Sequence, residues 1–459
     1  MQRRVAARPL CGRATFLNLF THEVSLPVPD QPSSRSVLAD WFRGHAAPLN
    51  TLDPHQPVDD LEPLREIVGS ARVVAVGEGA HFVEEFSRAR QRVLRFLAER
   101  CGFTVLALEF GFSEAFRLEP WLEGEGDDAG LAKVSATAAD WGAADLMHWL
   151  RRHNRTSGHP FRFAGIDVPE AGGQLRPALD PVADYLREVD PDALHLLDTV
   201  LEISDRFLEG SGSGAAAAPA WARLDPTEQN ALTAALARLL LRLRGAEPLY
   251  VRRSSQHRFD IARRRVEAAC HTDYLFHAMD ALLSGRGSGA DLSVREVYMA
   301  ESVRWHLDRA APGTRMVLVS HNAHIQKTPA TFGGPLTALP MGHHLQRMLG
   351  EDYRSVAVTH TTDHVPEMYP EESAEVGFTL ADAQLEPAEF GSVEAALIDA
   401  GLGDGITLTD LRRSPRDAHG VPLLNRMRSQ SSSLSAPIPE AFDAVLAVPT
   451  VTRDRTVRF

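Results

Sequence analysis

Lysine and cysteine are both scarce in this chain of 459 residues, and each scarcity excludes a class of chemistry. Lys133 and Lys327 are the only lysines, so a Schiff-base lysine or a phosphate-binding P-loop lysine has almost no candidate. The three cysteines, Cys11, Cys101 and Cys270, lie far apart and form no Cys-x-x-Cys pair. This spacing excludes a disulfide scaffold and a thiolate zinc site, and it is typical of a reducing compartment.

Excess positive charge and long apolar runs are also missing. The chain carries 48 Lys and Arg against 61 Asp and Glu, a formal net charge of -13, so its field disfavours non-specific binding to nucleic acid or anionic membranes. No apolar stretch reaches the roughly 18 residues of a membrane-spanning helix, and the basic N-terminal residues precede no secretory apolar run. We expect a cytoplasmic protein that acts on a small molecule, with no nucleic-acid or membrane partner; its oligomeric state stays open.

Five short apolar runs alternate with helical patterns along the chain, at 72–77, 103–109, 161–167, 315–320 and 354–359. Runs rich in Val, Ala and Leu that helices separate are typical of a parallel sheet covered on both faces. Between the third and fourth runs, Gly- and Ser-rich stretches at 209–220 and 286–290 read as joints that flank helical patterns at 226–244 and 251–283. The sequence therefore predicts an α/β fold of two α/β halves, with mainly parallel strands flanked by helices, plus an inserted helical hairpin.

The same features set the expected boundaries. Residues 1–35 mix basic, proline and serine positions without a sustained period and are predicted to be a poorly ordered tail. The first α/β half is placed at 36–208, the helical insertion at 209–290 and the second α/β half at 291–459. The insertion could form a lid over a cleft between the halves, or serve only as a packing element or oligomer contact.

Two of the predicted strands end in the same way. The run at 73–77 leads directly into Glu78-Gly79-Ala80-His81, and the run at 316–320 leads into His321-Asn322-Ala323-His324. In each motif a polar residue able to act as a ligand stands three positions before a histidine. That spacing puts both side chains on one face of a helical first turn. The two motifs therefore look like a degenerate internal repeat.

Carboxylates stand at the equivalent point of two other strands. Glu109 ends the run at 103–109, and Asp167 ends the run at 161–167. Acidic groups directly after buried strands are costly unless they are solvated, paired or ligated. Because ligand crevices form at the carboxyl ends of the strands in an open α/β sheet, we expect these carboxylates and the two histidine motifs to share one cleft.

The residue inventory narrows the chemistry of such a cleft. No Gly-x-Ser-x-Gly elbow follows a strand, and His81 does not begin a His-Glu-x-x-His motif. Without a serine, cysteine or lysine nucleophile, a histidine and carboxylate cluster suits general-base activation of water against an ester or lactone. Two histidines and two carboxylates are also plausible ligands of a divalent metal, so a metal site stays open.

Taken together, the motifs resemble the erythromycin esterase family of macrolide-lactone hydrolases over roughly residues 40–450. The resemblance rests on Gly77-Glu78-Gly79-Ala80-His81, Arg90, Glu109, Gly165-Ile166-Asp167, Arg295-Glu296-x-x-Met299-Ala300 and Ser320-His321-Asn322-x-His324. Two positions depart from the family pattern: Ala80 stands where drug-inactivating members typically carry threonine, and Glu296 stands where aspartate is common. Neither departure removes a catalytic group, but both leave macrolide specificity open.

The resemblance implies a hydrolase that works without a metal or other cofactor, with His81 as the general base. Carried over by position, Glu78 and Glu109 orient His81 or the water, and Arg90 holds a carboxylate or stabilises the oxyanion. His321 and His324 complete the catalytic cleft. Further residues are expected to contact the substrate, namely Asp167, Arg295, His343 and His344.

Two other functions fit the same cluster. A biosynthetic enzyme of this fold would use the acid–base groups for cyclisation, dehydration or rearrangement of a polyketide-like substrate. A protein that only sequesters its ligand is disfavoured by the concentration of ionisable groups, because affinity pockets are lined mainly by apolar side chains.

Overall fold

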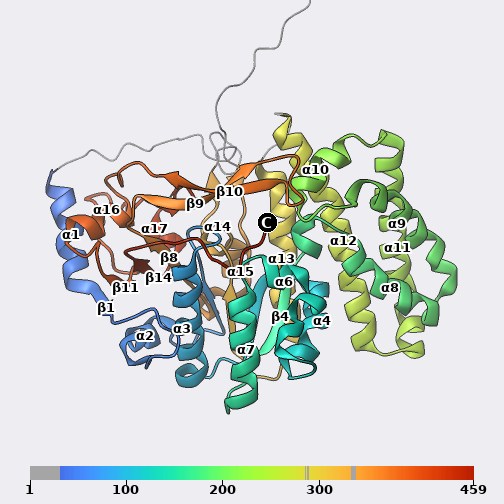
Figure 1. Cartoon of the computed structure of the whole chain (residues 1–459), viewed down its shortest axis with the longest axis horizontal. Coiled ribbons are helices and arrows are strands. Elements are labelled where there is room, and N and C mark those ends of the chain that lie inside the picture. Colours follow the sequence, from blue (N-terminus) through green and yellow to red (C-terminus); the bar gives the residue numbers. More distant parts are fainter. Residues whose placement is uncertain (1–31, 285, 287–288, 332–336) are drawn as a thin grey trace, which may run out of the picture.

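A computed structural model of the chain describes residues 32–284, 286, 289–331 and 337–459. An eight-stranded sheet runs through its main body in the order β1-β11-β14-β8-β2-β5-β3-β4 (Figure 1). Every neighbouring pair from β14 to β4 is parallel, whereas β1 and β11 add antiparallel pairs at one edge. The strands are β1 (Ala46–Leu49), β2 (Val73–Val76), β3 (Val105–Gly111), β4 (Arg162–Asp167), β5 (Met316–Val319), β8 (Tyr353–His360), β11 (Ile406–Asp410) and β14 (Ala444–Val448).

Strands from the two predicted halves interleave in this one sheet. β5 lies between β2 and β3, and β8 pairs with the other side of β2. The predicted fold class, with mainly parallel strands flanked by helices, is confirmed. Because β2 and β5 are direct neighbours, the two strand-end motifs come to the same point of the sheet edge.

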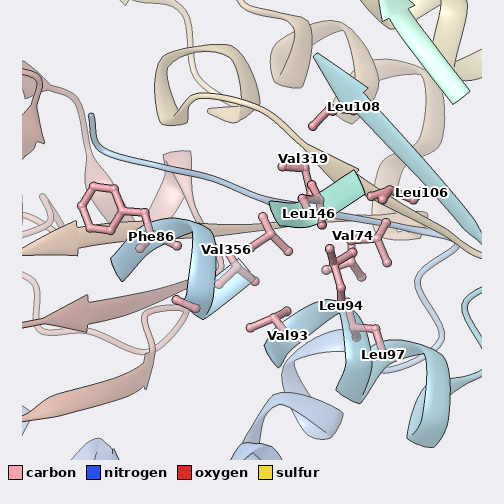
Figure 2. Packing of buried hydrophobic residues seen from close by; sticks show 14 of the residues in the cluster. Val74, Phe86, Val93, Leu94, Leu97, Leu106, Leu108, Leu146, Val319 and Val356 are labelled. Atoms are coloured by element: carbon pink, nitrogen blue, oxygen red, sulfur yellow. The ribbon is translucent and has the colours of Figure 1, made fainter. Parts of the chain in front are cut away.

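Alternate residues of each central strand face opposite sides of the sheet, and both sides are buried. Val74 and Val76 belong to an apolar cluster with α3 (Glu84–Cys101), whereas Val73 and Ala75 belong to a second cluster on the other side. Figure 2 shows Val93, Leu94 and Leu97 of α3 facing the side chains of the first cluster. The second cluster contains residues of α1 (Pro32–His45), α13 (Ser293–Asp308) and α15 (Met341–Leu349). Burying one such valine or leucine contributes about 1.5–3 kcal/mol, which fixes the strands and hence their carboxyl ends.

Shorter elements complete the body around the sheet. Two hairpins, β9–β10 and β12–β13, lie close to the carboxyl edge of the sheet, where both contribute residues to the cavity described below. These hairpins are β9 (His364–Pro370) with β10 (Phe378–Gln384), and β12 (Arg426–Ser429) with β13 (Ser432–Ser435). The remaining elements are α2 (Pro63–Val68), α4 (Phe112–Leu122), α5 (Leu131–Val134), α6 (Ala136–Asp140), α7 (Ala144–Thr156), α14 (Asn322–Ile325), α16 (Val393–Asp399), α17 (Ile438–Ala441), β6 (Ala330–Thr331) and β7 (Thr337–Ala338).

Five helices form a separate bundle on one side of the sheet, at the right of Figure 1. They are α8 (Arg176–Val189), α9 (Leu194–Leu208), α10 (Gly214–Ala222), α11 (Pro226–Arg253) and α12 (Gln256–Leu283). The predicted hairpin corresponds to α11 and α12. One apolar cluster joins all five helices, from Leu175 to Phe276, so the helical region starts before the predicted boundary at residue 209.

The prediction of a flexible joint at 209–220 is wrong for residues 214–220, because they lie in α10. Ser213 accepts hydrogen bonds from the main-chain N–H groups of Ala215 and Ala216 and thereby caps α10. Alanine, which makes up most of the segment that follows, has the highest helix propensity of any residue type. Serine is a favoured N-cap residue. A Gly-Ser stretch thus supplies a helix cap here.

Two other predicted segments fall partly outside the described residues. The predicted tail reaches residue 35, but residues 32–35 begin α1, so the expectation of poor order is wrong for them; residues 1–31 lie outside the described residues. Of the second joint, 287 and 288 lie outside them as well. Among the helices that the structure describes, none has the length and apolar character needed to cross a membrane.

Candidate active site

Asn322 ties the end of β2 to the ends of β5 and β8. Its main-chain N–H donates to the carbonyl of Glu78 at 2.9 Å. Its side-chain amide donates to the carbonyl of Val358 at 2.8 Å and accepts from the N–H of Val358 at 3.2 Å. A Cβ at Gly77 would overlap this amide, so the glycine lets the two motifs come together.

His81, Glu78 and Arg90 form the first part of the site. Nδ1 of His81 lies 2.8 Å from Oε1 of Glu78, and Arg90 Nη2 lies 2.8 Å from Oε2 of the same carboxylate. Burial by itself raises the pKa of Glu78, but the charge of Arg90 and the hydrogen bond with His81 outweigh it and hold this pKa below its usual value. An ionised carboxylate only accepts, so Nδ1 of His81 is the donor in this contact, and in the neutral form of the ring the lone pair lies on Nε2.

Glu109 is the hub of the second part. Oε1 accepts from Arg295 at 3.1 Å and lies 3.3 Å from Nε2 of His324. Oε2 accepts from the hydroxyl of Ser320 at 2.6 Å and from the main-chain N–H of His321 at 3.0 Å. Although burial opposes it, the nearby positive charges hold the pKa of Glu109 well below its usual range. Both oxygens are engaged, so this carboxylate orients its neighbours.

Arg295 links Glu109 to Asp167. Its Nε donates to Oδ1 of Asp167 at 2.9 Å, and Asp167 is 1% exposed. Despite burial, the carboxylates around Arg295 raise its pKa. The predicted substrate contacts Asp167 and Arg295 are therefore joined to the same charge network as Glu109.

His324 lies between two carboxylates. Its Nδ1 is 2.7 Å from Oε1 of Glu296, and its Nε2 is the group that faces Glu109. Burial disfavours the charged ring, but Glu296 and Glu109 outweigh it and raise the pKa of His324 to about 10. At neutral pH this residue is an imidazolium that donates from both nitrogens.

His321 has the opposite protonation behaviour. Its Nδ1 accepts from the main-chain N–H of Ala323 at 3.1 Å, so Nε2 carries the proton of the neutral ring. Burial, reinforced by His81, lowers the pKa of His321 to about 3. This Nε2–H is buried and has no hydrogen-bond partner within the described part of the chain. The ring centroid lies 4.7 Å from that of His81, so the two imidazole rings are neighbours at the cavity.

A cavity of about 960 Å³ opens over these residues. Most of the predicted site residues line it, namely Glu78, His81, Arg90, Glu109, Asp167, Arg295, His321 and His324. Apolar side chains form much of the remaining wall, namely Phe82, Trp141, Leu275, Met279, Met368 and Phe378. Leu275 and Met279 belong to α12, so the helical bundle contributes to the wall.

His343 and His344 are the two predicted residues that the structure does not bring to the cavity wall. Both lie in α15, and Nδ1 of His343 is 3.2 Å from the carbonyl oxygen of Lys327. They follow Met341, whose side chain is turned into the apolar cluster beneath the sheet. Although both histidines lie near the second motif in the sequence, they do not contact the cavity.

Three residues of the site were not predicted to have these roles. Ser320 donates to Glu109, and Glu296 faces Nδ1 of His324. Both residues stand in motifs that carry the family resemblance, which are therefore a sequence signal for them. Gln430 accepts the main-chain N–H of His81 at 2.6 Å across 349 residues of sequence, and no local pattern marks it. Elsewhere in the described residues, as in this site, no three His, Cys, Asp or Glu side chains are arranged to hold a metal ion.

Known proteins share this architecture. The family model described as Erythromycin esterase matches residues 98–451. The chain is 33% identical over 410 residues to Erythromycin esterase type II of Escherichia coli, covering 89% of this chain and 96% of that protein. It is 34% identical over 404 residues to Erythromycin esterase type I of Escherichia coli, covering 87% and 95%. A solved mutant of the erythromycin esterase EreC in its open conformation superposes with a TM-score of 0.81 at 32% identity, covering 89% of this chain and 98% of that one.

Proposed function

This chain belongs to the erythromycin esterase family and is an ester hydrolase, and we propose that it cleaves a macrolide-like lactone or ester with His81 as the general base. The observation that carries the proposal is the pair of ring nitrogens at the cavity. Nδ1 of each ring is engaged, by Glu78 in His81 and by the main-chain N–H of Ala323 in His321, which leaves Nε2 of each ring for the reaction, and the ring centroids are 4.7 Å apart.

In the proposed mechanism, a water molecule hydrogen-bonded to Nε2 of His81 attacks the ester carbonyl carbon. His81 takes the proton, and the carboxylate of Glu78 stabilises the imidazolium that forms. Arg90 keeps that carboxylate ionised and in place. The tetrahedral intermediate carries a negative oxygen, to which His321 donates from Nε2.

Collapse of the intermediate breaks the bond between the carbonyl carbon and the alkoxide oxygen. The imidazolium of His81 returns its proton to that alkoxide, so the products are a carboxylic acid and an alcohol. In a lactone both remain on one opened chain. The imidazolium of His324 donates to two carboxylates already, so in this scheme it supplies positive charge and no base.

The wall of the cavity favours a large, mainly apolar substrate. A volume of about 960 Å³ is near the upper end of the roughly 300–1,000 Å³ of small-molecule sites. Aromatic and methionine side chains, such as Phe82, Phe378 and Met368, offer the surface that a macrolactone ring would contact. These features support a macrocyclic substrate over a short-chain ester.

The test is incubation with erythromycin and with p-nitrophenyl butyrate in ¹⁸O-labelled water, with either EDTA or added divalent metal, followed by mass spectrometry. We expect a product that has gained one labelled water in the presence of EDTA. Conversion without incorporation of label would indicate cyclisation or rearrangement instead. Activity that requires added metal would assign the histidines and carboxylates as ligands, and no conversion of erythromycin would remove it as a substrate.

A further inference from the structure

Gln430 occupies an unusual backbone position beside the site. It begins the two-residue turn between β12 and β13, it is 0% exposed, and its φ is 50°. A residue with a Cβ is uncommon in this left-handed region, which glycine adopts far more readily. Such strain persists where the surroundings require it and clusters at functional sites.

The side chain and main chain of Gln430 both hold the loop that carries His81. Oε1 accepts the main-chain N–H of His81 at 2.6 Å. The main-chain N–H of Gln430 donates to the carbonyl of Gly79, also at 2.6 Å. Two hydrogen bonds therefore fix the segment between Gly79 and His81, which belongs to neither strand nor helix.

Glu367 in β9 holds the other end of the amide. Its Oε1 lies 3.4 Å from Nε2 of Gln430, and its carboxylate also accepts from the main-chain N–H groups of Met368 and Ser431, at 2.7 and 2.8 Å. Glu367 is 0% exposed. With its oxygens held by main-chain donors, Glu367 gives the Gln430 amide one orientation, with Oε1 toward His81 and Nε2 toward the carboxylate.

We propose that Gln430 is a positioning residue that sets the direction of the His81 ring through its main chain. The inference rests on the proposed role of His81 as base. Glu78 fixes the ring from one side, but a rotation of the loop would swing Nε2 away from the cavity while keeping the sequence spacing. A displacement of about 1 Å at a reacting group can lower the rate about 10²-fold.

The β12–β13 hairpin also forms part of the cavity wall through Ser429, Ser432 and Leu434. Gln430 therefore connects the surface that meets the substrate with the loop that carries the base. Loss of its side chain should disturb the reaction step and leave substrate binding nearly unchanged, because the residues of the cavity wall stay in place. The expected signature is a lowered kcat with a nearly constant KM.

The decisive variant is Gln430→Gly, because glycine relaxes the positive φ and removes only the side chain. We expect kcat for p-nitrophenyl butyrate to fall about 30- to 100-fold, KM to change less than threefold and Tm to stay level or rise. Ser431→Gly is the matched control: it removes a side chain from the same turn, keeps the main-chain donor to Glu367 and should keep the wild-type kcat. Wild-type kcat in Gln430→Gly would overturn the proposal, as would a loss explained entirely by a lowered Tm.

A charged variant tests the same contact from the other side. Gln430→Glu keeps an oxygen for the N–H of His81 but places a second carboxylate against buried Glu367. The repulsion should displace the side chain and lower both kcat and Tm. A lowered Tm with wild-type kcat would contradict positioning by this amide.

A spectroscopic readout separates this inference from the proposed function. In protein labelled with ¹⁵N-histidine, the signal of His81, identified by its loss in His81→Gln, should report the Nδ1–H tautomer in wild type and a mixture in Gln430→Gly. An unchanged tautomer signal would overturn the positioning role. Full activity of His81→Gln would refute the proposed function, whereas wild-type activity of Gln430→Gly beside an inactive His81→Gln would refute only the role of Gln430.

Discussion

The motifs after β2 and β5 each place a histidine three residues after a polar residue, but the charged side chains around the two histidines differ. His81 meets one carboxylate, that of Glu78, whose charge Arg90 balances. His324 meets two carboxylates, and both of its ring nitrogens are engaged. One carboxylate faces the first ring, through Nδ1, whereas the second ring lies between two carboxylates, which raise its pKa to about 10. The number of partner carboxylates, and not the spacing, separates a candidate base from a fixed positive charge.

The largest expected effect comes from removing the acceptor nitrogen of the first motif. His81→Gln should lower kcat for a cleaved ester about 10³-fold, within the 10²- to 10⁴-fold range of general acid–base catalysis. Steady-state kinetics will measure it, with circular dichroism to confirm the fold. His324→Gln is the comparison variant in the second motif. An equal or larger loss of kcat there, with the fold intact, would reverse the roles assigned to the two histidines.

Removing the charge that supports His81 should have the next largest effect. Glu78→Gln still offers an oxygen to Nδ1, but it no longer stabilises the imidazolium formed during the reaction. It also leaves the buried charge of Arg90 without its partner. We expect a loss of about 10² in kcat with a smaller change in KM. A reduced affinity with unchanged kcat would assign Glu78 to substrate binding instead.

The second motif should respond mainly in stability. Glu296→Gln removes one of the two carboxylates that raise the pKa of His324, and breaking such a buried pair costs about 3 kcal/mol. The folded-state pKa of about 10 lies above the unfolded value of roughly 6.5. The stabilisation by protonated His324 is therefore complete below about pH 6.5 and lost as the pH rises towards 10.

Thermal unfolding of wild type and Glu296→Gln from pH 6 to pH 10 checks this sign. The gap in Tm should be widest near pH 6 and narrow towards pH 10. A gap that widens with rising pH would show that His324 is neutral in the folded protein. We expect kcat at pH 7 to fall only about tenfold, since Glu296 contacts His324 and not the proposed base His81.

The smallest effect is expected outside the cavity wall. His343→Ala and His344→Ala change residues of α15 that do not line the cavity, so kcat and KM should both stay within about twofold of wild type. The same kinetic assay measures them. A rise of tenfold or more in KM would restore the sequence-based expectation that these histidines contact the substrate.

Much of the fold could be predicted because parallel strands buried on both faces have continuous apolar sequences. The five apolar runs correspond to β2, β3, β4, β5 and β8. The start of the helical bundle was harder to predict from the sequence. The pattern of α8 or α9 shows that one face is buried but does not say against which partner, and only the shared cluster with α11 and α12 assigns them to the bundle.

The amino-acid sequence by itself determined five strands of the sheet, the polar residues that follow four of them and the resemblance to the erythromycin esterases. Those properties follow from local periodicity and from motifs a few residues long. The tertiary structure decided the pairing of β2 with β5, the engagement of Glu109 by four donors and the hydrogen bond from His81 to Gln430. Protonation states belong to this second group, because a pKa depends on burial and on charges brought close by residues distant in the chain.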